Sequence, residues 1–380
     1  MTPARTDVVV IGGGPAGLAA ALAARRGGHQ VCVIDRGTSP IDKACGEGLM
    51  PDAVAALRRL GVDFDDGDGL RFSGIHFVDR RWTAGAHFPA ESGLGIRRAK
   101  LHQILVDRAL AAGVQIMWRT KATAIETEGV RIDGRLLPCR WIIGADGVNS
   151  TCRRLAGIEA QQQSGRRVGI RQHFAVRPWT DMVEVHWSEG EQAYVTPVGS
   201  DEICVVLLGR AGGAGFSELE RRFPLLAERL ASAAPTDTAR GAITGTVRLQ
   251  RVTRGNVALV GDASAAIDAV TGEGLALAFR QAVALGEALS HGDLSLYEAS
   301  HRRICRAPFI MASLLLLLDQ YDRLRDIALQ TLASRPRIFD GLLAAHVGAR
   351  HPAAASLDVA ALSFRLLCAA ATPRSWSLAP

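Results

Sequence analysis

The sequence predicts an α/β (α+β) fold, in which a parallel sheet with crossover helices is interleaved with an antiparallel sheet and followed by C-terminal helices. The first observation is a strand, glycine turn, helix and strand in succession over residues 7–35. The second is a series of short β-branched segments, separated by turn residues, over residues 165–210. The third is a Leu- and Ala-rich stretch with helical spacing that begins near residue 291.

The start of the chain has the pattern of one complete βαβ unit. The apolar run at 7–11 predicts a buried strand, and 15–26 predicts a helix with a proline in its first turn. The segment 30–34 predicts the second strand, which ends at Asp35. This arrangement around a glycine turn is typical of a Rossmann-type dinucleotide site.

Each residue type in the turn Gly12-x-Gly14-x-x-Gly17 suits a bound pyrophosphate. Gly12 permits the tight turn, Gly14 lets the phosphates approach the backbone, and Gly17 lets helix and strand pack closely. The helix N-terminus offers free N–H groups to the phosphates, and Asp35 would hold a ribose hydroxyl. The alternative is a helix-packing glycine set without a ligand. The predicted cofactor-binding residues of this unit are Gly12, Gly14, Pro15, Ala16, Gly17, Asp35 and Arg36.

Two later segments distinguish FAD from NAD by resemblance. Gly144-Ala145-Asp146-Gly147, followed by Ser150 and Arg153, resembles the GADG-x-x-S-x-x-R segment of the para-hydroxybenzoate hydroxylase superfamily. Gly261-Asp262-Ala263 resembles that superfamily's second flavin motif, and Thr271-Gly272-Glu273-Gly274 resembles its turn at the flavin pyrimidine edge. Arg98-x-x-Leu101 fits the R-x-x-L pattern of the same superfamily. The alternative to a cofactor contact at Arg98 is a solvated residue at the start of a helix. The resemblance implies further FAD contacts at Arg98, Ala122, Asp146, Gly261, Asp262, Gly272 and Gly274.

The segment Lys43-Ala44-Cys45-Gly46-Glu47-Gly48 carries the most information on the reaction. It resembles the K-x-C-G-G-G segment of geranylgeranyl reductases and the C-G-E segments of some bacterial flavin hydroxylases and halogenases. In both groups this loop lies along FAD, which implies cofactor contacts at Cys45 and Gly46. Cys45 is the candidate catalytic residue, which would orient substrate or relay a proton; a small residue packed in a glycine turn is the alternative. Glu47 replaces a reductase glycine and favours a hydroxylase.

Three functions stay open, with an FAD-dependent monooxygenase first. It would use NAD(P)H as a transient reductant, because only one dinucleotide fingerprint is present, and would hydroxylate a lipophilic aromatic or polyketide-type molecule. The C-terminal tail and the Cys45 segment resemble FAD oxidoreductases that accompany type III polyketide synthases. The alternatives are a geranylgeranyl-reductase-like enzyme that saturates prenyl double bonds and a flavin electron-transfer protein without oxygenation.

These assignments divide the chain into three parts. Residues 1–72, 96–160 and 245–290 form a discontinuous FAD-binding domain in this prediction. Residues 73–95 and 161–244 form a substrate-binding domain. Residues 291–380 form a C-terminal helical region, whose apolar helices either cap the core or cover a lipophilic substrate channel and give peripheral membrane contact.

Composition excludes several classes of partner and cofactor. The net charge is +6, but the arginines are scattered, which argues against nucleic-acid binding. Seven cysteines without a CxxC pair predict neither a disulfide framework nor a zinc site, so we expect no metal and a reducing, cytoplasmic location. The longest apolar run is too short to span a bilayer, which takes about 20 residues.

Overall fold

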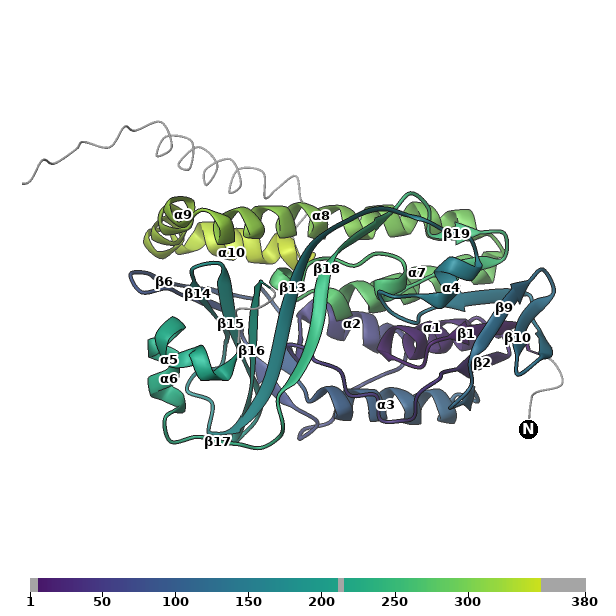
Figure 1. Ribbon diagram of the computed structural model, residues 1–380, viewed down its shortest axis with the longest axis horizontal. Coiled ribbons are helices and arrows are strands. Elements are labelled where there is room, and N and C mark those ends of the chain that lie inside the picture. Colours follow the sequence, from purple (N-terminus) through teal and green to yellow (C-terminus); the bar gives the residue numbers. More distant parts are fainter. Residues whose placement is uncertain (1–5, 211–214, 350–380) are drawn as a thin grey trace, which may run out of the picture.

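The structure is a computed structural model that describes residues 6–210 and 215–349 (Figure 1). Two sheet systems lie side by side, the parallel sheet with its helices at one end and the large, mainly antiparallel sheet at the other. The long helix α8 (Leu294–Gln320) runs along one side of the molecule. The predicted α/β architecture is confirmed.

The parallel sheet has the strand order β19-β20-β12-β1-β2-β8. Only β19 runs antiparallel to its neighbour. All residues of β1, β2, β12 and β20 are buried, which explains why these segments are continuous apolar runs. The strands span Val8–Ile11 (β1), Val31–Ile34 (β2), Gln115–Met117 (β8), Trp141–Gly144 (β12), Thr253–Arg254 (β19) and Val257–Leu259 (β20). The carboxyl ends of the parallel strands therefore meet at one edge, where ligands bind in such sheets.

Small residues let the flanking helices pack closely. α1 (Pro15–Arg26) is rich in alanine and contacts both α3 (Arg98–Ala111) and α7 (Gly274–His291). A Cβ atom at Gly286 of α7 would lie 2.9 Å from Cβ of Ala23, so a glycine is needed at this crossing. α2 (Pro51–Arg59) packs against α7 as well.

The large sheet has the order β17-β13-β16-β15-β14-β5-β6, with β18 on β13. Strand β13 is 16 residues long and pairs with β16, β17 and β18. The sequence predicted strands near β13 to β16, but it missed β18 and the pairing with β5 and β6. The strands span Gly74–Val78 (β5), Thr83–His87 (β6), Ala160–Ala175 (β13), Val183–Ser188 (β14), Glu191–Gly199 (β15), Glu202–Arg210 (β16), Ala234–Pro235 (β17) and Arg240–Leu249 (β18).

Two small sheets and one short helix complete the part near the parallel sheet. One sheet has the order β11-β10-β9, and the other has the order β3-β7-β4. The first comprises Ala122–Glu126 (β9), Gly129–Ile132 (β10) and Arg135–Pro138 (β11). The second comprises Gly48–Leu49 (β3), Leu70–Phe72 (β4) and Gly93–Gly95 (β7), and the helix is α4 (Thr151–Leu155). Through β3, the loop that holds Cys45 enters a sheet directly.

The C-terminal helices cover the edge of the large sheet at β6. α9 (Asp322–Ser334) and α10 (Pro336–His346) contact β6, and Leu332, Phe339 and Leu343 share a buried cluster with side chains of β5 and β14. Residues 350–380 of the predicted helical region lie outside the described residues. Among the described helices none alone is long and apolar enough to cross a membrane; α8 and α9, bent by 114° at their junction, pass that test together.

The segment that follows the large sheet's strand β16 forms three short helical elements. They are η1 (Phe216–Glu218), α5 (Leu219–Arg222) and α6 (Pro224–Leu230). Phe223 has φ −131° and ψ 63°, outside the helical region, because the ring of the following Pro224 clashes with a helical residue before it. The proposed division into domains stays a prediction; β18 runs continuously across its boundary at residue 245.

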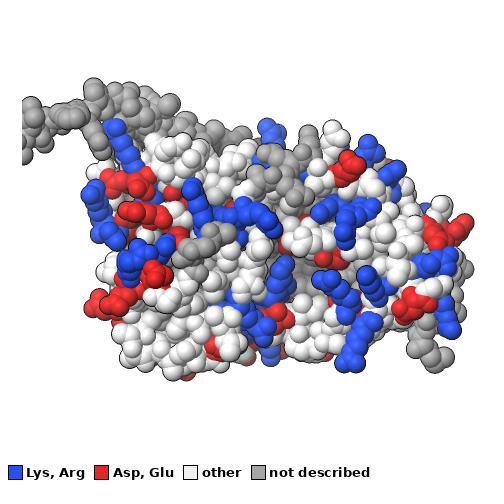
Figure 2. All heavy atoms as spheres, in the orientation of Figure 1, with Lys and Arg blue, Asp and Glu red and all other residues white. Residues whose placement is uncertain are grey.

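Basic side chains on the face drawn in Figure 2 lie in several separate groups, with acidic and uncharged surface between them. The structure offers no direct test of nucleic-acid binding, so its predicted absence stays a prediction.

A buried ion cluster joins the large sheet to α8 and to η3 (Ala269–Thr271). Arg167 of β13 is 5% exposed and lies 3.4 Å from a carboxylate oxygen of Asp319 and 3.8 Å from one of Asp268. Burial raises the pKa of both carboxyls, and the arginine opposes that rise. Gln192 donates a further hydrogen bond of 3.0 Å to Asp319. Arg167 therefore stabilises the charged forms of two buried carboxyl groups beside the cavity described below.

Arg167→Leu should destabilise the protein by about 3–5 kcal/mol near pH 8, because two buried carboxylates lose their cation. The loss of stability should be smaller near pH 5, because carboxyl groups with raised pKa values then take up protons and no longer need a neighbouring cation. Urea unfolding at both pH values measures this. Arg59→Leu is the control: its ion pair with Glu287 is 64% and 63% exposed, and its loss should stay within about 1 kcal/mol. An equal effect at both pH values for Arg167→Leu would contradict the assignment.

Candidate cofactor and substrate site

One cavity of about 1150 Å³ extends from the carboxyl edge of the parallel sheet to the C-terminal helices. Its walls include all the predicted cofactor-binding residues except Gly17. The same walls include side chains of the large sheet and of α8, α9 and α10. One space therefore connects the predicted cofactor site with the predicted substrate part.

The three positions of the turn require glycine for different structural reasons. A Cβ atom at Gly12 would lie 2.5 Å from the carbonyl of Ala145, and one at Gly17 would lie 1.8 Å from the Gly12 oxygen. A Cβ atom at Gly14 would have no protein atom within 4 Å, although Gly14 lines the cavity. Packing thus requires Gly12 and Gly17, whereas only a ligand would require Gly14. This agrees with a phosphate site at the start of α1.

Asp35 organises the same turn through its carboxylate. One oxygen accepts a hydrogen bond of 2.6 Å from the Gly13 amide, and the other accepts one of 2.6 Å from the Gly37 amide. His102, for which the sequence favoured a surface or core role, contacts the Gly13 carbonyl at 2.8 Å through Nε2. Asp35, Arg36 and Ala122 all lie on the cavity wall.

Arg98 stands at the start of α3 and lines the cavity. Its Nε is buried and has no hydrogen-bond partner among the described residues. Its backbone N–H donates to a Glu47 carboxylate oxygen at 2.9 Å, so the residue is held in place. An unsatisfied guanidinium at this point fits an anionic phosphate group.

The two aspartate motifs are joined by a buried arginine. Asp146 caps α4 by accepting from the Thr151 and Cys152 amides at 2.6 and 3.0 Å and from the Ser150 hydroxyl. Arg153 donates to the Ala263 carbonyl at 3.0 Å, which connects this turn to the second motif. Asp146, Gly261 and Asp262 line the cavity.

The turn before α7 carries a buried acid that lies beside a histidine from another helix. Gly272 has φ 66°, and a Cβ atom at Gly274 would meet no protein atom, which leaves space for a ligand at the helix start. Burial, with a smaller contribution from the Asp52 carboxylate and against the opposing charge of Arg280, raises the pKa of Glu273 to about 8. His346 of α10 lies 3.6 Å away, and burial lowers its pKa to about 4. Both groups are therefore mainly neutral near pH 7. No sequence pattern predicts this pair, because the packing of α10 against the start of α7 brings the two residues together.

Cys45 is held on the cavity wall by the loop that follows it. Its sulfur accepts a hydrogen bond of 3.4 Å from the Glu47 amide. Thr196 donates to the Gly46 carbonyl at 2.8 Å, and the Cys204 thiol contacts the Cys45 carbonyl at 3.7 Å. Glu47 has φ 59°, a backbone conformation that favours glycine. The loop therefore keeps the path of a glycine turn although it carries a glutamate.

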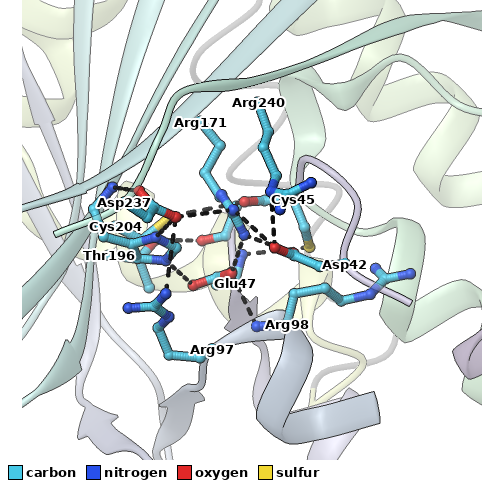
Figure 3. A network of polar contacts seen from close by, with 12 residues as sticks. Asp42, Cys45, Glu47, Arg97, Arg98, Arg171, Thr196, Cys204, Asp237 and Arg240 are labelled. Carbon is cyan, nitrogen blue, oxygen red and sulfur yellow. Dashed lines mark hydrogen bonds and ion pairs between the residues drawn. The ribbon is translucent and has the colours of Figure 1, made fainter. Parts of the chain in front are cut away.

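Glu47 lies at the centre of a buried polar network (Figure 3). One oxygen accepts from Arg171 at 2.9 Å, and the other is 2.6 Å from Nε2 of His173. The other ring nitrogen of His173 is 2.8 Å from an Asp237 oxygen. The sequence analysis did not identify Arg171, His173 or Asp237 as site residues. The available signal was the period of two in β13, which places residues 171 and 173 on one face of the strand.

The walls that the large sheet and the C-terminal helices contribute to the cavity are mainly apolar. Among the described residues of these walls, only Tyr194 and His346 have ionisable side chains. Burial raises the pKa of Tyr194 well above its usual value, and its hydroxyl donates to the Val270 carbonyl at 2.9 Å. The apolar residues from the large sheet and the C-terminal helices are Ile75, Phe77, Val183, Val185, Trp187, Val206, Leu208, Ala242, Ile243, Met311, Leu314, Leu315, Leu317, Leu318, Leu324, Ala328, Leu332, Phe339, Leu342 and Leu343.

Comparison with known proteins identifies similar sequences and folds. Residues 5–293 match the family model described as an FAD binding domain. The chain is 31% identical to a menaquinone reductase of Mycolicibacterium smegmatis, over 78% of this chain and 79% of that protein. It is 30% identical to a 6-methylpretetramide 4-monooxygenase of Streptomyces rimosus, over 77% of this chain and 78% of that protein. A flavoprotein/dehydrogenase from Cytophaga hutchinsonii shares the fold, with a TM-score of 0.82, 18% identity and coverage of 96% of this chain and 99% of that one.

Gly14→Val should leave the fold intact and abolish retention of FAD, because the new side chain enters the cavity and meets no protein atom at its Cβ. Gly17→Ala should instead reduce soluble, folded protein, because its Cβ would lie 1.8 Å from the Gly12 oxygen. Flavin absorbance per folded chain, with circular dichroism for folding, separates the two effects. Retention of FAD at the wild-type level in Gly14→Val would refute the phosphate site.

Glu273→Gln should stabilise the FAD-free protein at alkaline pH. The folded-state pKa of about 8 lies above the ordinary value of 4.5, so the wild type loses stability as the pH rises through this range. The variant should gain at least about 1 kcal/mol over the wild type near pH 9 and nothing near pH 5. Thermal melts across this range measure it, with Glu287→Gln, an exposed site on the same helix, as the control. A constant difference between variant and wild type would contradict the raised pKa.

Proposed function

Because the chain belongs to the FAD binding domain family and is an FAD-dependent oxidoreductase, we propose that it saturates a carbon–carbon double bond in the isoprenoid chain of a neutral lipid. The family lies within the superfamily of para-hydroxybenzoate hydroxylases and geranylgeranyl reductases. The proposal reverses the preference for a hydroxylase that Glu47 suggested in the sequence.

The residues at the carboxyl edge of the parallel sheet fit FAD. The open space at Gly14 and the free amides of α1 would hold the pyrophosphate, and the unsatisfied guanidinium of Arg98 would add a charge to it. Asp35 would contact the ribose, and the start of α7 would face the flavin ring. FAD bound there supplies the two electrons of the reaction as a hydride.

The apolar end of the cavity carries the proposal for the substrate. No side chain that the structure describes there would be charged near pH 7, since burial keeps His346 and Tyr194 neutral. A carboxylate or phosphate substrate would find no counter-charge among the described side chains that line this end, because the nearby Arg167 is already paired with Asp268 and Asp319. A hydrocarbon chain would lose only water-exposed apolar surface. A neutral lipid is therefore the class that these walls fit.

The conformation of Glu47 is compatible with a reductase. The reductase pattern has glycine at this position, and Glu47 occupies the conformation that glycine adopts without strain. The substitution thus preserves the loop and leaves Cys45 on the cavity wall. Saturation of a double bond needs a proton as well as a hydride, and the Cys45 thiol would supply it.

Hydroxylation is the second candidate, favoured by the similarity to a monooxygenase and by Trp187. The indole N–H of Trp187 is buried without a partner among the described residues, and the residue lines the cavity. A substrate oxygen would satisfy it, and both an aromatic polyketide and a quinone head group carry such oxygens.

The proposal also includes NAD(P)H as the reductant of the flavin and a membrane surface as the source of the lipid. NAD(P)H would reduce the flavin by binding transiently in the same cavity. An exposed stripe on α8 at helical spacing consists of Ile310, Leu314 and Leu317, and the exposed Tyr321 follows directly after the helix. These side chains would rest on the bilayer that holds the lipid. Leu314 and Leu317 also line the cavity, so the stripe is continuous with the substrate path.

The reductase proposal predicts that reduced enzyme transfers two electrons to a menaquinone or polyprenyl lipid under anaerobic conditions. Mass spectrometry should find the product heavier by two hydrogens in the isoprenoid chain. Cys45→Ser should slow this step by about 10²-fold or more while FAD binding is unchanged, because a serine hydroxyl is a much weaker acid than a thiol. Products that gain one oxygen atom in air, with no saturation of the chain, would establish the hydroxylase instead.

A further inference from the structure

We infer that Glu47, His173 and Asp237 form a buried triad that stores one proton beside Cys45 and returns it to the cavity during turnover. This triad deepens the proposed function, on which its role in turnover rests. Its three residues come from the Cys45 loop, from β13 and from the segment before β18. Glu47 and His173 are each no more than 1% exposed, and the Asp237 side chain is 18% exposed.

Hydrogen-bond geometry requires an extra proton in the triad. Both ring nitrogens of His173 face carboxylate oxygens, at 2.6 Å from Glu47 and 2.8 Å from Asp237. A neutral imidazole has only one N–H and can satisfy only one ionised carboxylate. The contact at 2.6 Å therefore needs a proton on either the His173 nitrogen or the Glu47 oxygen.

The surrounding charges also favour a bound proton. Three carboxylates, Asp42, Glu47 and Asp237, face the two guanidinium groups of Arg171 and Arg240. Arg97 lies 2.6 Å from Glu202 and forms a separate pair, although its other nitrogen is 3.8 Å from Asp237. The stored proton balances the remaining negative charge. Arg98 contributes its backbone N–H to Glu47, and its guanidinium belongs to the cofactor site.

A metal ion is the competing occupant of this place. The side chains of Glu47, His173 and Cys204 offer ligand atoms that lie within 4.8 Å of one another. However, Arg171 already donates to Glu47 at 2.9 Å, and a second cation on that carboxylate would be repelled. A proton fits the same place without that cost.

Glu47 is the link between the triad and the cavity. It lies on the cavity wall, two residues after Cys45, and its amide donates to the Cys45 sulfur. Its unusual φ of 59° places a carboxyl group where a glycine would leave none. Backbone strain of this kind persists where the surrounding contacts hold it, and it is often found at functional sites.

The proton balance is simple. The Cys45 S–H bond breaks as a C–H bond forms on the substrate, and the electron pair of the other new C–H bond comes with the hydride. The single stored proton then passes from the His173–Glu47 hydrogen bond, through the Glu47 carboxyl group, to the thiolate. This leaves Glu47 ionised and His173 neutral, with its Nδ1–H on Asp237, which orients the ring as the acid does in other acid–histidine pairs. Water restores the stored proton after product release.

The first test needs no substrate. The proton NMR spectrum of the FAD-loaded protein should contain one far-downfield resonance from the short Glu47–His173 hydrogen bond. This resonance should disappear in His173→Gln and in Glu47→Gly, a variant that suits the backbone at residue 47. The matched control is His186→Gln, another buried histidine with a carboxylate 2.9 Å away, which lies outside the cavity walls. Absence of the resonance in the wild type, or one equivalent of tightly bound divalent metal, would overturn the proposal.

The second test measures single-turnover reoxidation of the reduced enzyme by a polyprenyl quinone between pH 6 and 9. His173→Gln and Glu47→Gly should be slowed by about 10²-fold, with a rate that falls as the pH rises and recovers partly when imidazole is added. His186→Gln should match the wild type. Unchanged pH profiles in both triad variants would overturn the role of the triad. If the wild type itself does not react with the lipid while the resonance is present, the proposed function fails and the proton store stands.

Discussion

The carboxylate of Glu47 holds together three parts of the chain that are far apart in sequence. It accepts hydrogen bonds from Arg171 on β13 and from the amide of Arg98 at the start of α3, and it contacts His173. Since Glu47 itself follows the Cys45 loop, these bonds fix that loop between the parallel sheet and the large sheet. The position of Cys45 and the shape of the cavity beside it both depend on this buried charge. A charge without such partners would be costly to bury.

The two sheets contribute chemically different walls to the cavity. The parallel sheet ends in backbone amides, glycines and a few polar side chains, which suit a charged dinucleotide. The large sheet and the C-terminal helices contribute apolar walls, which suit a hydrocarbon. Arg167 of the large sheet joins these two regions, because its partner Asp268 lies just before η3 and its partner Asp319 lies on α8. An enzyme that transfers electrons from a polar cofactor to an apolar substrate needs both kinds of wall.

Sequence reasoning succeeded where the signal was local. The βαβ unit was predicted because Pro15–Arg26 and its flanking strands are continuous in the chain, and their boundaries in the structure agree closely. It was weaker where pairing joins distant segments: β18 and the β5–β6 hairpin were not recognised as parts of the large sheet. Strand propensity depends on the neighbours that a strand acquires, and these cannot be read from the strand alone.

The sequence by itself determined the dinucleotide fold, the FAD motifs and the presence of a cysteine in a glycine-rich loop. Only the tertiary structure decided that Glu47 keeps a glycine-like backbone, that His173 and Asp237 complete a triad with it, and that His346 reaches Glu273. The physical reason is that motifs record backbone requirements within one turn, whereas burial, charge balance and proton sharing arise from side chains that lie far apart in the chain, as Glu47 and His173 do.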